Sequence, residues 1–139
     1  MKNPKELLLE YLDVFNDSQK AAALFAEDGR LELPFLQSVG LPPVYTGREE
    51  IQHVIDTVLG WVPDWKFDNK KIFIENDQQV AAEYEVFGNT QHTKRPFYNL
   101  FVARLAAENG EIKLLREAHD PIRSAKALFE NGVDDIPKN

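Results

Sequence analysis

The last strand-like run of the sequence, residues 111–119, places two titratable side chains on one face. Glu117 and His119 are two residues apart, and side chains at that spacing point to the same side of a strand. In an apolar environment, loss of hydration would raise the pKa of the Glu117 carboxyl, so that it could transfer a proton near neutral pH with His119 as its partner. The alternatives are a histidine satisfied by solvent and a surface glutamate paired with a basic residue. The candidate basic partners are Lys113, Arg95 and Arg104.

Other reactive chemistries lack the residues that they need. The chain has no cysteine, which excludes thiol catalysis and thiolate zinc sites. Its three histidines are scattered, with His53 expected on an exposed helix face and His92 in a polar turn, so no metal site is predicted. Neither a glycine-rich phosphate loop nor a Gly-x-Ser-x-Gly elbow is present. The remaining residue types favour proton chemistry by side chains, without a cofactor.

Composition and charge narrow the choice of partner. The chain has 139 residues, 43% hydrophobic and 28% charged, which is typical of one globular domain that buries about 68–70% of its unfolded surface. Sixteen basic against 23 acidic residues give a net charge of −7, which argues against binding to nucleic acid or to an anionic membrane. No stretch approaches the roughly 20 apolar residues of a membrane span, and the first residues lack the apolar centre of a signal peptide. We therefore expect a cytoplasmic protein.

Helical spacing dominates the first half of the chain. Apolar periodicity and capping residues predict helices over 4–15, 19–25, 48–59 and 122–129. Thr46 is predicted to cap the third helix in a capping box with Glu49. Residues 30–35 alternate between apolar and polar positions, as a half-buried strand requires, and residues 37–46 are expected to form a loop.

Four further strands are predicted in a row, over 65–75, 79–87, 97–107 and 111–119. Turn residues separate them, first at Asn76-Asp77 and then at Gly88-Asn89, and the last pair, Asn109-Gly110, is the strongest two-residue hairpin signal. Helices followed by a strand meander indicate an α+β domain, with three N-terminal helices over one face of a curved, mainly antiparallel sheet. We expect a single domain over residues 1–132 and a mobile tail over 133–139.

Several short strings stand in a particular order along the chain. They are Leu24-Phe25-Ala26-Glu27-Asp28, Gly47-Arg48-Glu49, Pro63-Asp64-Trp65, Tyr98-Asn99-Leu100-Phe101, Gly110-Glu111-Ile112 and Arg116-Glu117. Together they resemble the nuclear transport factor 2-like (NTF2-like) superfamily, in its SnoaL-like and ketosteroid-isomerase-like branch. The resemblance runs from about Tyr11 to Leu128 and is closest to the phenazine-biosynthesis A/B proteins. Each string is weak alone, and their order and spacing carry the assignment.

The resemblance implies a cone-shaped α+β barrel whose wide end encloses an apolar cavity. It also implies a homodimer formed through the exposed sheet face, with a small hydrophobic molecule as the partner. The superfamily includes isomerases, polyketide cyclases, dehydratases, epoxide hydrolases and binding proteins without catalysis. The fold alone therefore does not decide the function.

The resemblance also suggests roles for individual polar residues. Glu117 occupies the position of an acid/base glutamate that lines the pocket of the phenazine proteins. Tyr11 matches the helix-one tyrosine that is the oxyanion donor of ketosteroid isomerases, and a core tyrosine is the alternative. Asn99 matches the second oxyanion partner, where its amide can donate without a raised pKa. His119 shares the predicted pocket face and would tune Glu117.

Two departures from the family pattern bear on the reaction. Leu33 stands where the isomerases have their general base, so steroid-type isomerisation by that mechanism is not expected. The adjacent Glu32 points the other way and is expected at a surface or interface. Val54 and Val58 stand where the phenazine proteins have a histidine and a serine. His53 lies one residue away, about 100° around the helix, and takes over neither role.

We expect apolar and aromatic residues to contact the ligand. Leu33, Phe101 and Leu115 are predicted to line the cavity. Trp65 belongs to a local cluster of aromatic residues that could form a flat ligand site. A place in the core or in a dimer interface is the alternative for this cluster.

The leading hypothesis is a cofactor-independent acid–base enzyme of isomerase, cyclase or dehydratase type, acting on a small hydrophobic metabolite. Glu117 would transfer the proton, while Tyr11 and Asn99 would stabilise charge on oxygen. The alternative is a non-catalytic binding protein with the same cavity, which the loss of the isomerase base favours. A third hypothesis is a dimeric interaction module whose interior is filled by its own side chains.

Overall fold

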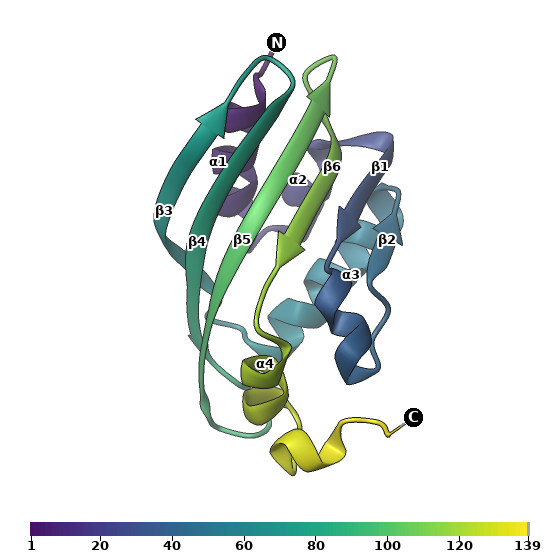
Figure 1. Ribbon diagram of the computed structural model, residues 1–139. Coiled ribbons are helices and arrows are strands. Elements are labelled where there is room, and N and C mark those ends of the chain that lie inside the picture. The colour runs from purple at the N-terminus through teal and green to yellow at the C-terminus, as the bar shows by residue number, and fades with distance from the viewer. Residues whose placement is uncertain (139) are drawn as a thin grey trace.

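A computed structural model describes residues 1–138 as a curved sheet packed against helices (Figure 1). The helices are α1 (Pro4–Val14), α2 (Ser18–Ala23), α3 (Arg48–Trp61) and α4 (Pro121–Leu128), with 3₁₀ helices η1 (Pro34–Val39) and η2 (Gly132–Asp135). The strands are β1 (Phe25–Glu32), β2 (Val44–Thr46), β3 (Lys66–Glu75), β4 (Gln79–Asn89), β5 (Pro96–Glu108) and β6 (Glu111–Ala118).

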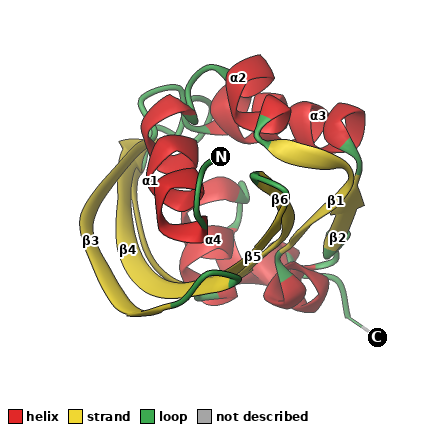
Figure 2. Cartoon of the chain, turned by 90° about the horizontal axis from the view of Figure 1, so that it is seen from above, coloured by secondary structure: helices red, strands yellow, loops and turns green. Residues whose placement is uncertain are grey.

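The strands form one sheet in the order β2-β1-β6-β5-β4-β3. The β1–β6 pair is parallel, and the other neighbouring pairs are antiparallel. Seen from above, the sheet curls into an open barrel, and α1, α2 and α3 close the open side (Figure 2). Helix α4 lies at one end of the sheet (Figure 1). The expected α+β architecture, with a curved and mainly antiparallel sheet, is confirmed.

Strand β1 begins earlier in the chain than the sequence pattern predicts. It starts at Phe25, not at Arg30, and its register against β6 shifts between these two residues. Gly29 permits the shift, because a Cβ atom there would lie 2.6 Å from the carbonyl oxygen of Ile112. The loop predicted over 37–46 is wrong in part, since this stretch holds the end of η1 and all of β2.

The start of α3 differs from the predicted capping box. Gly47 is the N-cap, with a φ of 87° that favours glycine, and no side chain caps it. The carboxylate of Glu50, not of Glu49, accepts a hydrogen bond from the backbone N–H of Thr46, at 2.6 Å. The path of the chain out of β2 therefore moves the cap one residue past Thr46.

The strand meander follows the prediction, with one turn displaced. Asn109 and Gly110 both have positive φ, 54° and 74°, as the predicted two-residue hairpin requires. The turn predicted at Gly88-Asn89 lies further along the chain, because β4 continues to Asn89 and β5 starts only at Pro96.

The core lies between the concave side of the sheet and the helices. Tyr11, Phe25 and Tyr84 are among its largest fully buried side chains. Their burial removes apolar surface from water, which is the main favourable contribution to folding. The aromatic residues of this core also border the site described below.

The C-terminal stretch packs on η1. The predicted tail includes η2, and Pro137 lies so close to Gly40, the C-cap of η1, that a Cβ there would come within 2.6 Å of it. None of the helices in residues 1–138 has both the length and the apolar character needed to cross a membrane.

Candidate functional site

Glu117 projects from β6 into the interior of the barrel. Leu115, Glu117 and His119 are buried in alternation with more exposed residues, as the strand period predicts, and Glu117 is 3% exposed. No ion pair to it forms among the described residues, so the surface ion pair considered above is wrong. The three candidate partners contact other groups: Lys113 pairs with Asp28, Arg104 donates to Gln79, and Arg95 donates to carbonyls at the end of α4.

A buried tyrosine reaches Glu117 across the sheet. Ala103 of β5 stands opposite Glu117, and Ala82 of β4 stands opposite Ala103. These small side chains leave room for Tyr84 of β4, whose phenol donates a hydrogen bond to the Glu117 carboxylate. The carboxyl therefore has a neutral partner in place of a cation.

Burial determines the protonation states of Glu117, Tyr11 and Tyr84. It raises the pKa of Glu117 to about 7, while the hydrogen bond from Tyr84 opposes the rise. Burial, together with the nearby Glu117 charge, raises the pKa values of Tyr11 and Tyr84 well above their ordinary range. Both phenols stay neutral, whereas the carboxyl exists in both protonation states near neutral pH.

Two adjoining cavities lie between the sheet and the helices. Glu117 and Tyr11 border a recess of about 40 Å³ whose other lining residues are apolar. The larger of these two, which we call the main cavity, has a volume of about 310 Å³ and is bordered by residues of η1, α3, β5 and α4. Its volume lies at the lower end of the range for small-molecule sites, roughly 300–1,000 Å³. The partition between the two spaces consists of the residues that line both, Leu33, Val54, Val58, Trp65 and Phe101.

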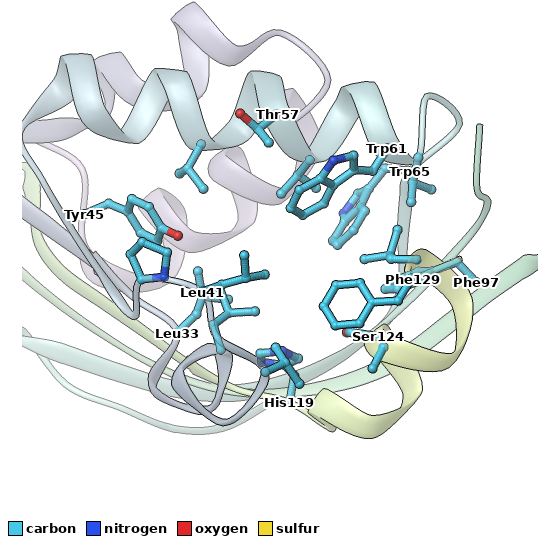
Figure 3. Close-up of a pocket in the computed structure, with 18 of the residues that line it drawn as sticks. Leu33, Leu41, Tyr45, Thr57, Trp61, Trp65, Phe97, His119, Ser124 and Phe129 are labelled. Carbon is cyan, nitrogen blue, oxygen red and sulfur yellow. The ribbon is translucent and has the colours of Figure 1, made fainter. Parts of the chain in front are cut away.

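The main cavity has a largely apolar wall (Figure 3). Of the residues predicted to contact a ligand, Leu33, Trp65 and Phe101 border it. Leu115 does not. It is fully buried in the core and pairs with Leu31 of the neighbouring strand β1. Leu115 lies two residues before Glu117 on β6, on the side away from α4. An interior filled by side chains, as the interaction-module hypothesis requires, is not what the described residues form.

His119 borders the main cavity through a buried ring. It is 8% exposed and packs on Phe101 with 5.3 Å between the ring centroids. Burial lowers its pKa to about 4, so the imidazole is neutral at pH 7. Within residues 1–138, its buried Nδ1 has no hydrogen-bond partner, and neither has the buried Nε1 of Trp65.

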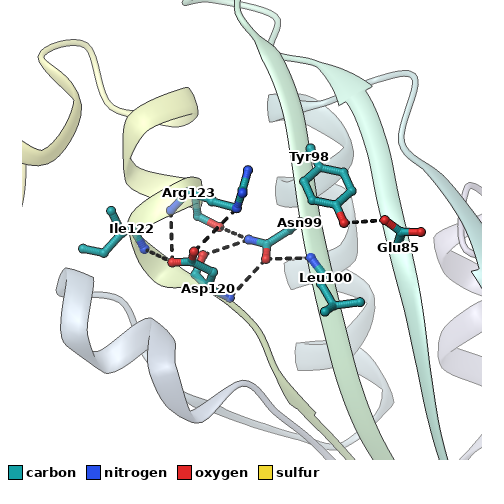
Figure 4. Close-up of polar contacts among 8 residues, drawn as sticks. Glu85, Tyr98, Asn99, Leu100, Asp120, Ile122 and Arg123 are labelled. Carbon is teal, nitrogen blue, oxygen red and sulfur yellow. Dashed lines mark hydrogen bonds and ion pairs between the residues drawn. The ribbon is translucent and has the colours of Figure 1, made fainter.

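Asn99 is fully buried, but its amide is engaged within the protein (Figure 4). Its oxygen accepts from the backbone N–H groups of Leu100 and Asp120, at 2.9 and 3.0 Å. Its nitrogen donates to the Asp120 carbonyl at 2.8 Å and to the Ser124 hydroxyl at 3.2 Å. The amide thus joins β5 to the first turn of α4, and Asn99 borders neither cavity. The predicted oxyanion contact is corrected: Ser124, not Asn99, reaches the main cavity.

Tyr84 and Ser124 are among the residues of the site that escaped the sequence reasoning. Tyr84 lies 33 positions before Glu117, and the local pattern does not pair them. The available signal was the small size of Ala82 and Ala103, which is evident only once the strand register is known. Ser124 reaches the cavity because of the way α4 packs against β5, which no local signal predicts.

Glu32 borders neither cavity, but it is buried and not exposed as expected. The guanidinium groups of Arg30 and Arg116 pair with it, and the hydrogen bond from Arg30 is the main reason that its pKa lies below the ordinary value. In the part of the chain that the structure describes, no three His, Cys, Asp or Glu side chains come together as a metal site.

Known proteins were compared with the chain by sequence and by structure. The family model of the SnoaL-like domain matches residues 8–115. The phenazine biosynthesis protein PhzA1 of Pseudomonas aeruginosa is 30% identical over 110 residues, which cover 76% of this chain and 67% of that protein.

Solved structures of other proteins have the same fold as this chain. A phenazine biosynthesis-related protein of Pseudomonas aeruginosa, PhzB2, superposes with a TM-score of 0.75 at 24% identity, over 97% of this chain and 86% of that chain. A protein with a ketosteroid isomerase-like fold from Catenulispora acidiphila, solved in complex with trimethylamine, gives a TM-score of 0.73 at 16% identity, over 94% of each chain. The chain therefore belongs to the SnoaL-like domain family and has the NTF2-like, ketosteroid-isomerase-like fold.

Proposed function

We propose that the protein is an acid–base enzyme of isomerase or cyclase type that acts on a small, largely apolar metabolite. The Glu117 carboxyl carries the proposal. It is buried, its pKa is raised to about 7, and the recess that it borders adjoins the main cavity. A carboxyl with this pKa is about half ionised near neutral pH, so it can both take and return a proton within one cycle.

The proposed reaction moves a proton next to a carbonyl group. The Glu117 carboxylate removes a proton from a C–H bond beside the carbonyl, and the electron pair of that bond moves toward the carbonyl oxygen. In a β,γ-unsaturated ketone the electron pair then returns from the oxygen through the conjugated bonds. The carboxylic acid delivers the proton to the γ carbon and the C=C bond moves next to the carbonyl, so that substrate and product contain the same atoms. Tyr84 stabilises the carboxylate before the first step and after the second, and Tyr11, a neutral phenol at the same recess, is the proposed donor to the charged oxygen.

The relatives support a small-molecule role. PhzA1 is a phenazine biosynthesis protein, and this chain shares 30% of its residues over the aligned region. Leu33 occupies the place that the isomerase general base has in the resembling enzymes. The proposal therefore assigns proton transfer to Glu117, which lies on β6 and borders the recess.

The test compares Glu117→Gln with a matched variant, Glu83→Gln, in a deuterium-exchange assay. Metabolites that co-purify with the protein and a panel of cyclic ketones are incubated with each variant in D₂O, and label uptake is followed by mass spectrometry. We expect Glu117→Gln to slow the exchange roughly 10²–10⁴-fold. Glu83, which pairs with Lys71 on the other face of the sheet, should be replaceable without effect. Unchanged exchange in Glu117→Gln would show that another group moves the proton.

A non-catalytic binding protein is the second candidate. Leu33, Val54 and Val58 favour it, because these residues on the cavity wall supply no group that can transfer a proton. In that case the wild-type protein binds a co-purified metabolite or a ketone of the panel, and no deuterium enters the bound molecule.

We further propose a homodimer formed through the outer face of the sheet. Strands β4 and β5 pair along their length and expose three large apolar side chains there: Phe87 (39% exposed), Leu100 (40%) and Val102 (48%). Val102→Lys places a charge among them. Light scattering should report a dimer for the wild type and a monomer for the variant, and a wild-type monomer would contradict the proposal.

A cytoplasmic location also stays a prediction, which cell fractionation can test.

A further inference from the structure

We propose that Val54 and Val58 of α3 limit which ligands can reach Glu117. Only a narrow, unbranched chain passes these two side chains into the recess, while the bulkier body of the ligand stays in the main cavity. The inference rests on the proposed function, which requires the reacting carbon atoms to lie beside Glu117. It adds the shape of the substrate, an apolar body with an unbranched chain next to the carbonyl group, and the residues that select this shape.

The two cavities differ strongly in size. The recess beside Glu117 has a volume of about 40 Å³, against about 310 Å³ for the main cavity. A water-sized group needs about 10–15 Å³. The recess therefore holds roughly three non-hydrogen atoms, which matches the α, β and γ carbons of the proposed proton transfer. A ring or a branched chain is too wide for it.

Five side chains stand where the two cavities adjoin, and the aromatic ones are fixed by packing. These residues, which form the partition, are Leu33, Val54, Val58, Trp65 and Phe101. The Trp65 indole stacks on Phe15 and on Phe97, with 5.4 Å between the ring centroids in each pair. The Phe101 ring packs against His119, with 5.3 Å between the centroids. Neither aromatic ring of the partition can turn aside without disturbing the core.

The two valines are the part of the partition that α3 contributes. They are one helical turn apart and therefore lie on the same face of the helix. Both are half-buried and pack against the core. A valine has two branches at Cβ, which leaves one strongly preferred rotamer in a helix, so neither side chain can swing away. The methyl groups of Val54 and Val58 thus set the width of the passage on the side of α3.

The recess favours an apolar chain. Apart from Glu117 and Tyr11, its lining residues are apolar. Each methylene group that leaves water for such a space contributes roughly 4-fold in affinity. The chain also displaces solvent from the Glu117 carboxyl, which changes the environment of that group. The carbon-13 NMR signal of the carboxyl therefore reports whether the chain reaches the recess.

Val39 of η1 provides a matched control. It is buried and borders the main cavity but not the recess. Val39→Ala therefore enlarges the main cavity by the same change of side chain without widening the partition. A general effect of cavity size would appear in this variant, whereas an effect of the partition would not.

The test compares two isomeric ketones that share a naphthalene body. In n-butyl 2-naphthyl ketone the chain is unbranched, and in tert-butyl 2-naphthyl ketone the same atoms form a wide group. Titration calorimetry with the wild-type protein gives the two dissociation constants. We expect the unbranched ketone to bind roughly 10-fold or more tightly, as the burial of two methylene groups in the recess would provide. The unbranched ketone alone should change the carboxyl signal of Glu117.

Substitutions in the partition should change this preference in both directions. Val54→Ala and Val58→Ala each widen the passage and should each reduce the preference roughly 3- to 10-fold, whereas Val39→Ala should leave it unchanged. Val58→Ile narrows the passage, so the unbranched ketone should bind roughly 10-fold more weakly and no longer change the Glu117 signal. Because this variant adds a methyl group and leaves no cavity, it keeps the test decisive if an alanine variant fails to fold.

The possible outcomes separate the size limit from the enzyme. The size limit is disproved if the tert-butyl ketone binds as tightly as its isomer, if neither ketone binds, or if Val58→Ile binds the unbranched ketone as the wild type does. It is also disproved if Val39→Ala changes the preference as much as the variants of the partition do. If the size limit holds and Glu117→Gln still exchanges deuterium at the wild-type rate, the enzyme proposal fails while the size limit stands.

Discussion

The Tyr84 phenol on β4 donates a hydrogen bond to the Glu117 carboxylate on β6, across the intervening strand β5. Ala103 of β5 stands opposite Glu117, and its small side chain leaves room beside the carboxyl. Burial alone favours the neutral form of the carboxyl, whereas this bond favours the ionised form. The pKa of Glu117 is thus a balance of two opposing effects, and one of them can be removed without moving the carboxyl.

Tyr84→Phe removes this bond and keeps the ring. Because the bond lowers the pKa of Glu117 against the effect of burial, we expect that pKa to rise above about 7 in the variant. Carbon-13 NMR of the glutamate side-chain carboxyl groups measures the shift. Tyr98→Phe is the control, since that phenol donates to Glu85 on the outer face (Figure 4). Equal titration of Glu117 in both variants would contradict the assigned role of Tyr84.

Two buried groups give the stability of the fold opposite dependences on pH. The pKa of Glu117 is raised from 4.5 to about 7, so its stabilising contribution is complete below pH 4.5 and is lost as the pH rises through 7. The pKa of His119 is lowered from 6.5 to about 4, so its contribution is complete above pH 6.5 and is lost as the pH falls through 4. Each contribution is on the order of 3 kcal/mol.

Between pH 4.5 and 6.5 these two contributions cancel, and single substitutions remove the cancellation. We expect the free energy of unfolding of Glu117→Gln to increase with pH over this range, and that of His119→Phe to decrease. Urea denaturation at successive pH values measures both slopes against the wild type. Parallel curves for the two variants would show that the burial of these groups does not control the pH dependence.

Asn99→Ala should affect stability more than proton transfer. The substitution leaves the backbone N–H groups of Leu100 and Asp120 without an acceptor inside the protein, which costs about 2–4 kcal/mol. Asn131→Ala, which removes an exposed hydrogen bond to Asp135, is the control and should cost less than about 1 kcal/mol. Urea denaturation gives both values. A variant of wild-type stability that no longer exchanges deuterium would instead support the oxyanion role first predicted for Asn99.

Two glycines should respond to alanine in opposite ways. In Gly29→Ala the new Cβ meets the backbone oxygen of Ile112 at 2.6 Å, so β1 and β6 must separate, and we expect a loss of about 2–4 kcal/mol. Gly60 lies in α3 with no atom within 4 Å of its Cβ position, so Gly60→Ala should gain up to about 1 kcal/mol. Thermal unfolding of the two variants checks the difference, and a tolerated Gly29→Ala would mean that β1 can move away from β6 at the register shift.

The sequence pattern correctly predicted those elements whose conformation depends on residues close together in the sequence. The Asn109-Gly110 hairpin and the alternation around Glu117 follow from residue types and spacing, and both are present. The start of β1 at Phe25 could not be predicted in this way, because it depends on the close approach of Gly29 to a strand much later in the chain. The N-cap of α3 likewise depends on how β2 delivers the chain to the helix.

The residues of the candidate site also fall into those that the sequence predicted and those that depend on long-range packing. The family resemblance pointed to Glu117 and to the wall residue Leu33, both of which the fold brings to the recess. Tyr84 could not be found without the register of three strands. Asn99 was placed on the correct strand, but its role depends on the docking of α4, which occupies its amide and presents Ser124 to the cavity instead.

Trp61 and Trp65 both border the main cavity, and the chain contains no further tryptophan. All of the indole emission of the protein therefore originates at the wall of one cavity. A molecule that enters it changes the polarity and contacts around both rings, and so alters the emission wavelength or intensity without any label. The intrinsic tryptophan fluorescence of the protein can therefore be used to screen a library of metabolites before the ligand is known.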